Sequence, residues 1–356
     1  MENANHSSEF ADPISAENDW ITLLKDNRRS GGQAVATLLT ATRSRWQLRL
    51  GHSIRSAPVL RAEILYVTSI SGFLHAIHAD NGAVKFKFQA GGPIHSTPAL
   101  SANKVLFGCD DGKVYAVDGQ SGAKHWEFTA GAEVWASPVV RSGAVFFGSA
   151  DGAMYAVDAE SGRPRWKCAL GGRIYSTAYA TEKRIYAGCG DGHVYCLEAA
   201  SGKIAWKTLT GKGIDSSPAV QGDLVLIGSE DFFFYALDAN DGSVKWKYET
   251  GLGISSSPAV SGDLLFVGSK DGYLHALECA TGQARWKVQA GDVITAPPLA
   301  GDSVVYLQSG GTQALDRVTG RVLWRAGLGG AVQCVPVVAG KSVYLASNGG
   351  ELYALE

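Results

Sequence analysis

Residues 206–245 read WKTLTGKGIDSSPAVQGDLVLIGSEDFFFYALDANDGSVK, and the same kind of segment recurs eight times along the chain. Each copy opens on an aromatic residue, and these residues are Trp46, Phe86, Trp126, Trp166, Trp206, Trp246, Trp286 and Trp324. The first six intervals between them are 40 residues and the last is 38. A fixed period of this length is typical of a solenoid, a propeller or an array.

The content of one copy favours the propeller. Within residues 206–245, short strand-like runs at 206–209, 214–220, 224–229 and 234–238 are separated by glycine-containing or polar turns. Four strands of about five residues with tight turns use up roughly forty residues, and nothing in the copy has helical spacing. Four short antiparallel strands per repeat describe a propeller blade, because radial repetition protects the sheet edges.

The number of copies and the position of the first one predict how the ring closes. The Trp46 strand stands alone before any complete blade, and the chain stops at residues 352–356, where a final tryptophan strand is due. We therefore predict an all-β, eight-bladed β-propeller of four-stranded antiparallel blades over residues 46–356, closed by the N-terminal Trp46 strand. Residues 1–45 are expected to form an N-terminal extension of short helices or partly disordered chain, or alternatively a docking segment.

The junction between copies carries a recognisable motif. Residues 156–166 read AVDAESGRPRW, and closely similar segments run over 116–126 and 236–246. This pattern resembles the tryptophan-docking motif of the PQQ-like (quinoprotein-type) propeller repeats, a BamB-like family, and the resemblance covers residues 46–356. It implies that the eight repeated aromatic residues dock against neighbouring blades. The family includes quinone-dependent dehydrogenases, BamB-type outer-membrane assembly lipoproteins and sensor domains, so the resemblance says more about fold than about function.

Catalysis is not expected. The dehydrogenases of the family carry an adjacent cysteine pair and calcium ligands in long inserted loops, whereas this chain has no Cys-Cys pair and a constant step without room for insertions. Its eight histidines lack metal-ligand spacing, and no phosphate-binding or nucleophile-elbow signature occurs. The repeated acidic residues, such as Asp118 and Asp158, are interpreted as caps of turn amides. We predict a non-enzyme with no catalytic residues, cofactor or metal.

Composition narrows the class of partner and the compartment. With 32 basic and 34 acidic residues the net charge is −2, which excludes a nucleic-acid footprint and a polybasic membrane patch. No apolar run is long enough for a transmembrane helix, so no direct membrane insertion is expected. The first residues have neither the basic flank nor the apolar core of a leader peptide. The expected location is the cytoplasm, or the periplasm if a leader has been removed, and the propeller is expected to be monomeric.

One position varies among copies that are otherwise alike. It is the second residue of the strand that begins Ile/Val-x-[Ser/Ala]-x-Pro, and it reads Arg55, His95, Trp135, Tyr175, Asp215, Ser255, Thr295 and Gln333. The resemblance implies that this innermost strand lines the central channel, so that these residues ring one mouth of it. We predict binding at Arg55, His95, Trp135, Tyr175, Asp215 and Gln333, because sites that join aromatic surface to a few polar groups bind ligands and peptides. The alternative is a water-filled channel with a freely varying lining.

A second irregularity lies on the hairpin turns expected to share that face. Where other copies read Asp-Gly, this one reads Asp231-Phe232-Phe233. Phenylalanine at a positive-φ position is strained, so the turn is expected to change shape and to offer apolar surface. We predict that Phe232 and Phe233 form a partner surface, with packing inside the blade as the alternative.

Together these features predict a non-catalytic β-propeller scaffold that binds a protein or peptide at the channel mouth. A small-molecule sensor for a quinone-like or nucleotide-like ligand is one alternative, and a BamB-like assembly factor of the outer membrane is another. A PQQ-dependent dehydrogenase is the least expected.

Overall fold

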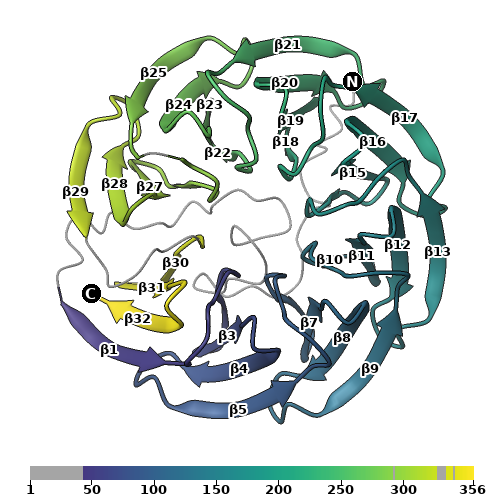
Figure 1. Ribbon diagram of the computed structural model, residues 1–356, viewed down its shortest axis with the longest axis vertical. Coiled ribbons are helices and arrows are strands. Elements are labelled where there is room, and N and C mark those ends of the chain that lie inside the picture. Colours follow the sequence, from purple (N-terminus) through teal and green to yellow (C-terminus); the bar gives the residue numbers. More distant parts are fainter. Residues whose placement is uncertain (1–42, 292, 327–333, 340) are drawn as a thin grey trace, which may run out of the picture.

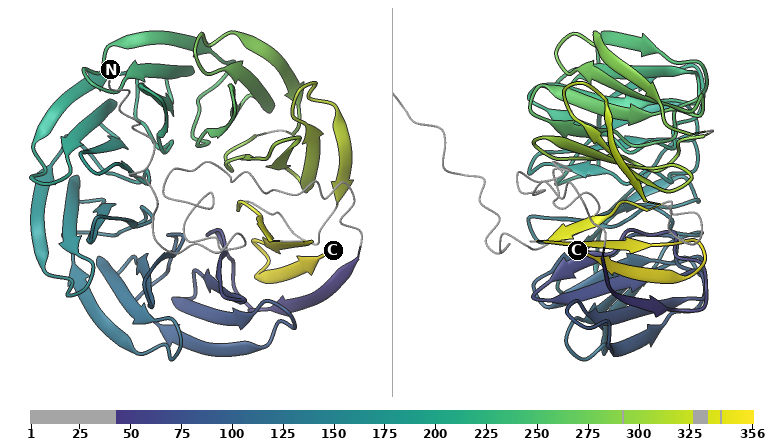
Figure 2. Two further views of the ribbon diagram at one scale, coloured as in Figure 1. Left: turned by 180° about the vertical axis from the view of Figure 1, so that it is seen from behind. Right: turned by 90° about the vertical axis from the view of Figure 1, so that its left-hand side faces the viewer.

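The computed structural model describes residues 43–291, 293–326, 334–339 and 341–356. This part of the chain contains 32 β-strands and no helix, and the strands form eight four-stranded antiparallel sheets. The sheets stand around a common axis as the blades of a ring (Figure 1). Figure 2 shows the same ring from behind and from the side. The predicted fold class is confirmed, whereas the helices expected before residue 46 fall almost entirely outside the described residues.

The first four blades follow one another along the chain, each from its innermost to its outermost strand. The first contains β2 (Val59–Arg61), β3 (Ile64–Thr68), β4 (Phe73–His78) and β5 (Val84–Gln89). The second contains β6 (Ala99–Ser101), β7 (Lys104–Gly108), β8 (Lys113–Asp118) and β9 (Lys124–Thr129). The third contains β10 (Val139–Arg141), β11 (Ala144–Gly148), β12 (Ala153–Asp158) and β13 (Pro164–Ala169). The fourth contains β14 (Tyr179–Ala180), β15 (Arg184–Gly188), β16 (His193–Glu198) and β17 (Ile204–Leu209).

The remaining blades repeat this order, and the eighth takes its outer strand from the other end of the chain. The fifth contains β18 (Ala219–Gln221), β19 (Leu224–Gly228), β20 (Phe233–Asp238) and β21 (Val244–Glu249). The sixth contains β22 (Ala259–Ser261), β23 (Leu264–Gly268), β24 (Tyr273–Glu278) and β25 (Ala284–Gln289). The seventh contains β26 (Leu299–Ala300), β27 (Val304–Gln308), β28 (Thr312–Asp316) and β29 (Val322–Ala326). The eighth contains β30 (Val337–Ala339), β31 (Ser342–Ala346), β32 (Glu351–Leu355) and β1 (Ser44–Arg49).

Pairing between β1 and β32 joins the two ends of the described chain. The strands are antiparallel, with Trp46 opposite Ala354 and Leu48 opposite Leu352. The amide of Arg43 donates to the carbonyl of Glu356 at 3.0 Å, and the amide of Glu356 donates back to Arg43 at 2.9 Å. The eighth blade is therefore a four-stranded sheet like the others.

The two middle strands of each blade form the core, and the outermost strand forms the surface. In the fifth blade, β19 and β20 are almost entirely buried, whereas β21 alternates exposed and half-buried positions and carries Lys245 and Lys247. Lysines on an edge strand oppose its pairing with another chain. The same alternation occurs in β5, β13 and β25.

The repeated aromatic residues dock on the next blade, as Trp206 shows. Its indole nitrogen donates to the carbonyl of Ala239 at 3.0 Å, and a Cβ on Gly242 would lie only 2.5 Å from the indole ring. Glycine is required there because φ is +76° and the ring covers the turn. Equivalent indole-to-carbonyl bonds join Trp46 to Ala79, Trp126 to Ala159, Trp166 to Ala199, Trp246 to Cys279 and Trp286 to Arg317.

Phe86 docks on the next blade in the same way, and Trp324 contacts a tyrosine of its own blade. Phe86 packs against Gly122 of the second blade, where an added Cβ would lie 2.5 Å from the ring. Trp324 is half-buried and faces Tyr306, with ring centroids 6.1 Å apart. The acidic residues of the same turns act as caps. For example, Asp118 accepts bonds from the amides of Gln120 and Ser121, and these bonds lower its pKa to about 2.

Candidate binding site

A chain of hydrogen bonds links the innermost segments of successive blades. The amide of Ala57 donates to the hydroxyl of Thr97 at 3.1 Å, and the amide of Thr97 donates to the hydroxyl of Ser137 at 2.9 Å. The series continues from Ser137 to Thr177, from Thr177 to Ser217 and from Ser217 to Ser257. Each of these residues lies two positions after a variable residue of the innermost segment. The bonds therefore hold the variable residues of neighbouring blades next to one another.

Three of the predicted binding residues form a continuous stack. The rings of His95 and Trp135 have centroids 4.6 Å apart and an interplanar angle of 30°. Trp135 and Tyr175 are also 4.6 Å apart, at 19°. The guanidinium carbon of Arg173 lies 5.1 Å from the centroid of Tyr175. We call His95, Trp135 and Tyr175 the aromatic column. Trp135 remains 38% exposed within it.

A residue that the sequence analysis did not single out holds the first ring of the column. Asp110, in the β7–β8 turn, lies with its carboxylate oxygen 3.5 Å from Nε2 of His95, and its amide donates to Pro93 at 2.9 Å. Burial lowers the pKa of His95 and raises the pKa of Asp110, so both groups are biased toward their neutral forms. The sequence did contain a signal, because this turn position varies as widely as the mouth position: Ile70, Asp110, Ala150, Gly190, Glu230, Lys270, Gly310 and Asn348.

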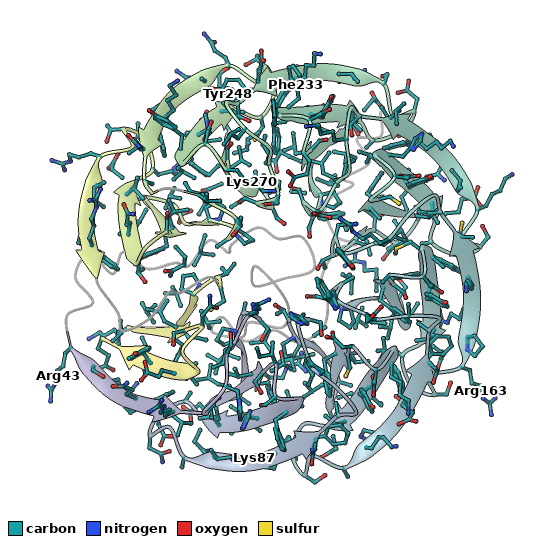
Figure 3. All side chains as sticks on the ribbon, viewed as in Figure 1. Arg43, Lys87, Arg163, Phe233, Tyr248 and Lys270 are labelled. Atoms are coloured by element: carbon teal, nitrogen blue, oxygen red, sulfur yellow. The ribbon has the colours of Figure 1, made fainter. Side chains whose placement is uncertain are left out.

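Charged groups follow the column in the fifth and sixth blades. Burial raises the pKa of Asp215, and the nearby Arg173 opposes that shift. Glu230 and Lys270 form an ion pair beside it, with distances of 2.7 and 2.8 Å from the ammonium nitrogen to the two carboxylate oxygens. Figure 3 shows Lys270 near the axis of the ring. Asp215 itself makes no hydrogen bond or ion pair with any residue that the structure describes.

The other variable residues occupy the rest of the ring. Arg55 is exposed in the first blade, and its charge contributes to the lowered pKa of His95. Ser255 is half-buried, and its buried hydroxyl has no hydrogen-bond partner within the described ranges. Thr295 is exposed. Gln333, which we predicted as a binding residue, lies outside the described residues. The structure thus brings His95, Trp135 and Tyr175 together and places Arg55 and Asp215 beyond the two ends of the column.

The turn at Phe232 differs from expectation. We expected its shape to change, and this is wrong: Phe232 has φ +78°, close to the +80° of Gly112 in the second blade. The amide of Ser229 still donates to Phe233 at 3.0 Å, and the amide of Phe233 still donates to the carboxylate of Asp231 at 3.0 Å. These bonds maintain the turn, so Phe232 itself bears the strain, which typically costs about 1–3 kcal/mol.

The two phenylalanines do not form one surface. Phe232 is 36% exposed, and its ring lies 4.7 Å from the ammonium group of Lys212, in the loop that leads to Asp215. Phe233 is half-buried under Lys247, at 4.2 Å, and packs on its own blade. In Figure 3, Phe233 lies toward the outer strands, far from Lys270. Only Phe232 therefore lies beside the loop that carries a mouth residue.

The three rings of the column contact one another directly, so no planar group lies between them. Within the described ranges, no group of three or more histidine, cysteine or acidic side chains is placed to hold a metal ion. No helix able to cross a membrane occurs in the part of the chain that the structure describes.

Comparisons with known proteins agree with the repeat pattern. A family model described as outer membrane protein assembly factor BamB matches residues 30–179, 167–293 and 293–356. No curated protein matches. Among solved structures, BamB from Moraxella catarrhalis is 19% identical with a TM-score of 0.77, and the match covers 88% of this chain and 99% of that one.

Two dehydrogenases are similar in fold as well. A europium-containing methanol dehydrogenase is 13% identical with a TM-score of 0.82, over 96% of this chain and 98% of that one. The quinohemoprotein alcohol dehydrogenase of Comamonas testosteroni is 15% identical with a TM-score of 0.82, over 96% and 81%. At these identities the structural likeness concerns the fold alone. The family model, in contrast, matches almost the whole repeat region, and the chain belongs to the family of the outer membrane protein assembly factor BamB.

Proposed function

We propose that this protein is a non-catalytic β-propeller scaffold that binds a protein or peptide partner over the aromatic column. The observation that carries the proposal is the stack of His95, Trp135 and Tyr175, in which Trp135 keeps 38% of its surface exposed. Exposed tryptophan and tyrosine side chains at the centre of a surface are the residues that most often dominate the energy of protein interfaces.

The fold does not require this column. Ser255 and Thr295 occupy the equivalent position in the sixth and seventh blades, and the backbone there follows the same strand order. An aromatic residue at this position is therefore not needed to build a blade. The exposed part of the Trp135 indole is apolar area that a partner can bury. Burial of apolar area stabilises a complex by about 25 cal/mol per Å².

The non-catalytic part of the proposal rests on the sequence and on the site. The chain has no adjacent cysteine pair, and its repeats keep a nearly constant length without inserted loops. The carboxylate of Asp110 lies 3.5 Å from the column, and its neighbour there is His95, whose pKa is lowered by burial. This arrangement supplies hydrogen bonds and apolar surface, which suit recognition.

The family match favours a second, more specific candidate, a role in outer-membrane protein assembly. This candidate places the protein in the bacterial envelope, whereas the sequence analysis predicted the cytoplasm. Fractionation of the native host, followed by detection of the chain in each compartment, distinguishes the two locations. Recovery in the envelope would support the assembly role, and recovery in the cytoplasm alone would contradict it.

Affinity purification from the native host tests the main proposal. The wild type is compared with Trp135→Ala and with a matched control, Ile204→Ala, because Ile204 on the outer strand β17 is exposed to a similar extent, 37% against 38%. Mass spectrometry reads bound proteins and bound small molecules. We expect a protein that is retained by the wild type and by Ile204→Ala and is lost from folded Trp135→Ala. Retention of a small molecule alone would instead indicate a sensor, and identical results for all three proteins would contradict the proposal.

A further inference from the structure

The aromatic column lies between two charges of opposite sign. Arg55 belongs to the first blade and Asp215 to the fifth, so four of the eight blade steps separate them around the ring. His95, Trp135 and Tyr175 fill the three steps between them. A cation and a carboxylate therefore lie on opposite sides of the mouth, joined by an apolar surface.

Neither charge forms an ion pair with a described residue. Arg55 makes no ion pair with a carboxylate of the described residues, and Asp215 makes none with a described cation. Asp215 is half-buried, and burial raises its pKa. Removing part of a carboxylate from water without a partner costs free energy, so this arrangement favours any ligand that brings a positive charge.

The other charges near the mouth do not change this polarity. Glu230 is held by Lys270 at 2.7 Å, and Asp110 faces His95 at 3.5 Å. Two exposed charges flank the middle of the column, Glu133 and Arg173, which occupy equivalent positions in neighbouring blades. Arg173 lowers the pKa of Asp215 and Glu133 raises the pKa of Asp110, but neither forms an ion pair with that neighbour. Arg55 and Asp215 remain as the unpaired charges at the two ends.

We infer that the mouth recognises a peptide segment of mixed charge, with an acidic side chain bound at Arg55, an apolar centre on the exposed edge of Trp135, and a basic side chain bound at Asp215. This inference rests on the proposed function and specifies the chemistry of the partner. Two steps of the column are 4.6 Å each, so the four steps from Arg55 to Asp215 come to roughly 18 Å along it, which an extended peptide at about 3.3–3.6 Å per residue covers with on the order of four to six residues. A partner with like charges at both ends would leave one of the two mouth charges unmatched or repelled.

Four capped synthetic peptides of about six residues test the inference by calorimetric titration. They share the centre Leu-Pro-Leu-Pro and differ only in their end residues, which are Glu and Lys, Glu and Glu, Lys and Lys, or Gln and Gln. We expect the Glu and Lys peptide to bind the wild type roughly tenfold or more tightly than each of the other three, a difference of about 1.4 kcal/mol. Trp135→Ala should weaken binding of all four.

Two charge reversals make the test specific. Asp215→Lys should shift the preference to the Glu and Glu peptide, and Arg55→Glu should shift it to the Lys and Lys peptide. Ile204→Ala, on the outer strand, should leave the preference unchanged. The thermal unfolding midpoint of each variant confirms that it is folded before titration.

The outcomes separate this inference from the proposed function. If the four peptides bind equally and Trp135→Ala abolishes that binding, the mixed-charge inference is wrong and the peptide-binding function stands. A preference of the wild type for either like-charged peptide also overturns the inference. If no peptide binds, the inference fails. Loss of Trp135-dependent protein capture in addition would overturn the proposed function as well.

Discussion

The repeated aromatic residues that dock between blades, which we call the docking layer, and the variable residues of the mouth come from the same eight repeats. The docking residues are nearly the same in every repeat, whereas the mouth residues differ from one repeat to the next. In the docking layer one contact recurs, as in Trp206 against Gly242 and Trp166 against Gly202. At the mouth, equivalent positions hold side chains as different as Trp135 and Asp215. The backbone is alike in both cases. Repetition therefore identifies the residues that hold the ring together, and variation within it identifies the residues free to serve binding.

The mouth also has a regular part, in which hydrogen bonds link neighbouring blades, and a part without these bonds. The hydrogen-bonded hydroxyl series links the first blade to the sixth and ends there, because the seventh blade has Pro297, which has no hydroxyl group, where the second to sixth blades have serine or threonine. The aromatic column lies within the linked part. Because these hydrogen bonds fix the backbone that carries the three rings, less conformational entropy is lost when a partner binds to them.

The largest expected effect comes from removing a docking residue. Trp206→Ala should lower the free energy of unfolding by about 3–5 kcal/mol, because it leaves a cavity between two blades and removes one of the two hydrogen bonds that the carbonyl of Ala239 accepts, the other coming from Tyr186. Trp135→Ala removes two ring contacts and the indole group that faces Asp110, and it should cost about 1–3 kcal/mol. Denaturant unfolding of both variants measures the difference. Equal losses would mean that the mouth supports the fold as much as the docking layer does.

The stability of the fold should decrease in acid because a histidine is buried in the core of the first blade. His75 stands where five other blades have a tyrosine, and burial lowers its pKa from 6.5 to about 4. Below about pH 6.5 the unfolded chain binds a proton that the folded protein does not, so stability falls as the pH drops to about 4. At about 1.4 kcal/mol per pKa unit, the loss is roughly 3 kcal/mol.

The variant His75→Gln checks this expectation. Glutamine is chosen because Gln313 occupies the equivalent position in the seventh blade. Unfolding measured at several values between pH 7 and pH 4 should show a shallower decline in the variant than in the wild type. The same decline in both proteins would show that His75 is not the source of the acid sensitivity.

Alanine substitutions at Gly242 and Gly222 distinguish the stability cost of close packing from the cost of backbone strain. Gly242 and Gly222 both have positive φ, +76° and +56°, but a Cβ would meet Trp206 at the first and nothing within 4 Å at the second. Gly222→Ala should cost about 1 kcal/mol from the backbone alone, and Gly242→Ala roughly 2–4 kcal/mol because the indole must move as well. Thermal unfolding ranks the two variants. A similar cost at both sites would mean that the docking contact tolerates extra volume.

The smallest change in stability is expected for Phe232→Gly, and we expect this substitution to stabilise the protein. Phe232→Gly restores the glycine that six other blades carry at this position of the turn and relieves the strained φ of +78°. The relief of about 1–3 kcal/mol is partly offset by the entropy of glycine and the lost contact with Lys212, so we expect a net gain of about 1 kcal/mol. The variant's melting temperature measures it. A loss of stability would indicate that Phe232 packs inside the blade.

The sequence was sufficient to predict the fold and to identify the variable position that holds the three stacked rings, but it did not predict how these rings are arranged. The step between Trp126 and Trp166 predicts one blade after another because every copy repeats the same docking contact. The stack at Trp135 depends on its neighbours in space, 40 residues away on either side, and on how each ring turns.

Other features escaped prediction for local reasons. Asp110 was missed because only its distance from His95 shows that the two side chains meet. Phe232 was misjudged because the side chain of Asp231 holds the turn whatever residue follows it. Phe232 and Phe233 were expected to share one surface because they are adjacent in the sequence, but Phe232 lies in the turn beside Lys212, whereas Phe233 begins β20 and lies under Lys247.

The most direct test of the account is photo-crosslinking in the native host, with p-benzoylphenylalanine placed once at position 135 and once at position 204. The two positions are equally exposed, at 38% and 37%, but one lies in the aromatic column and the other on the outer strand β17. The account predicts a defined protein adduct from position 135 and none from position 204. Adducts of equal yield from both positions, or from position 204 alone, would contradict the claim that the mouth is the binding surface.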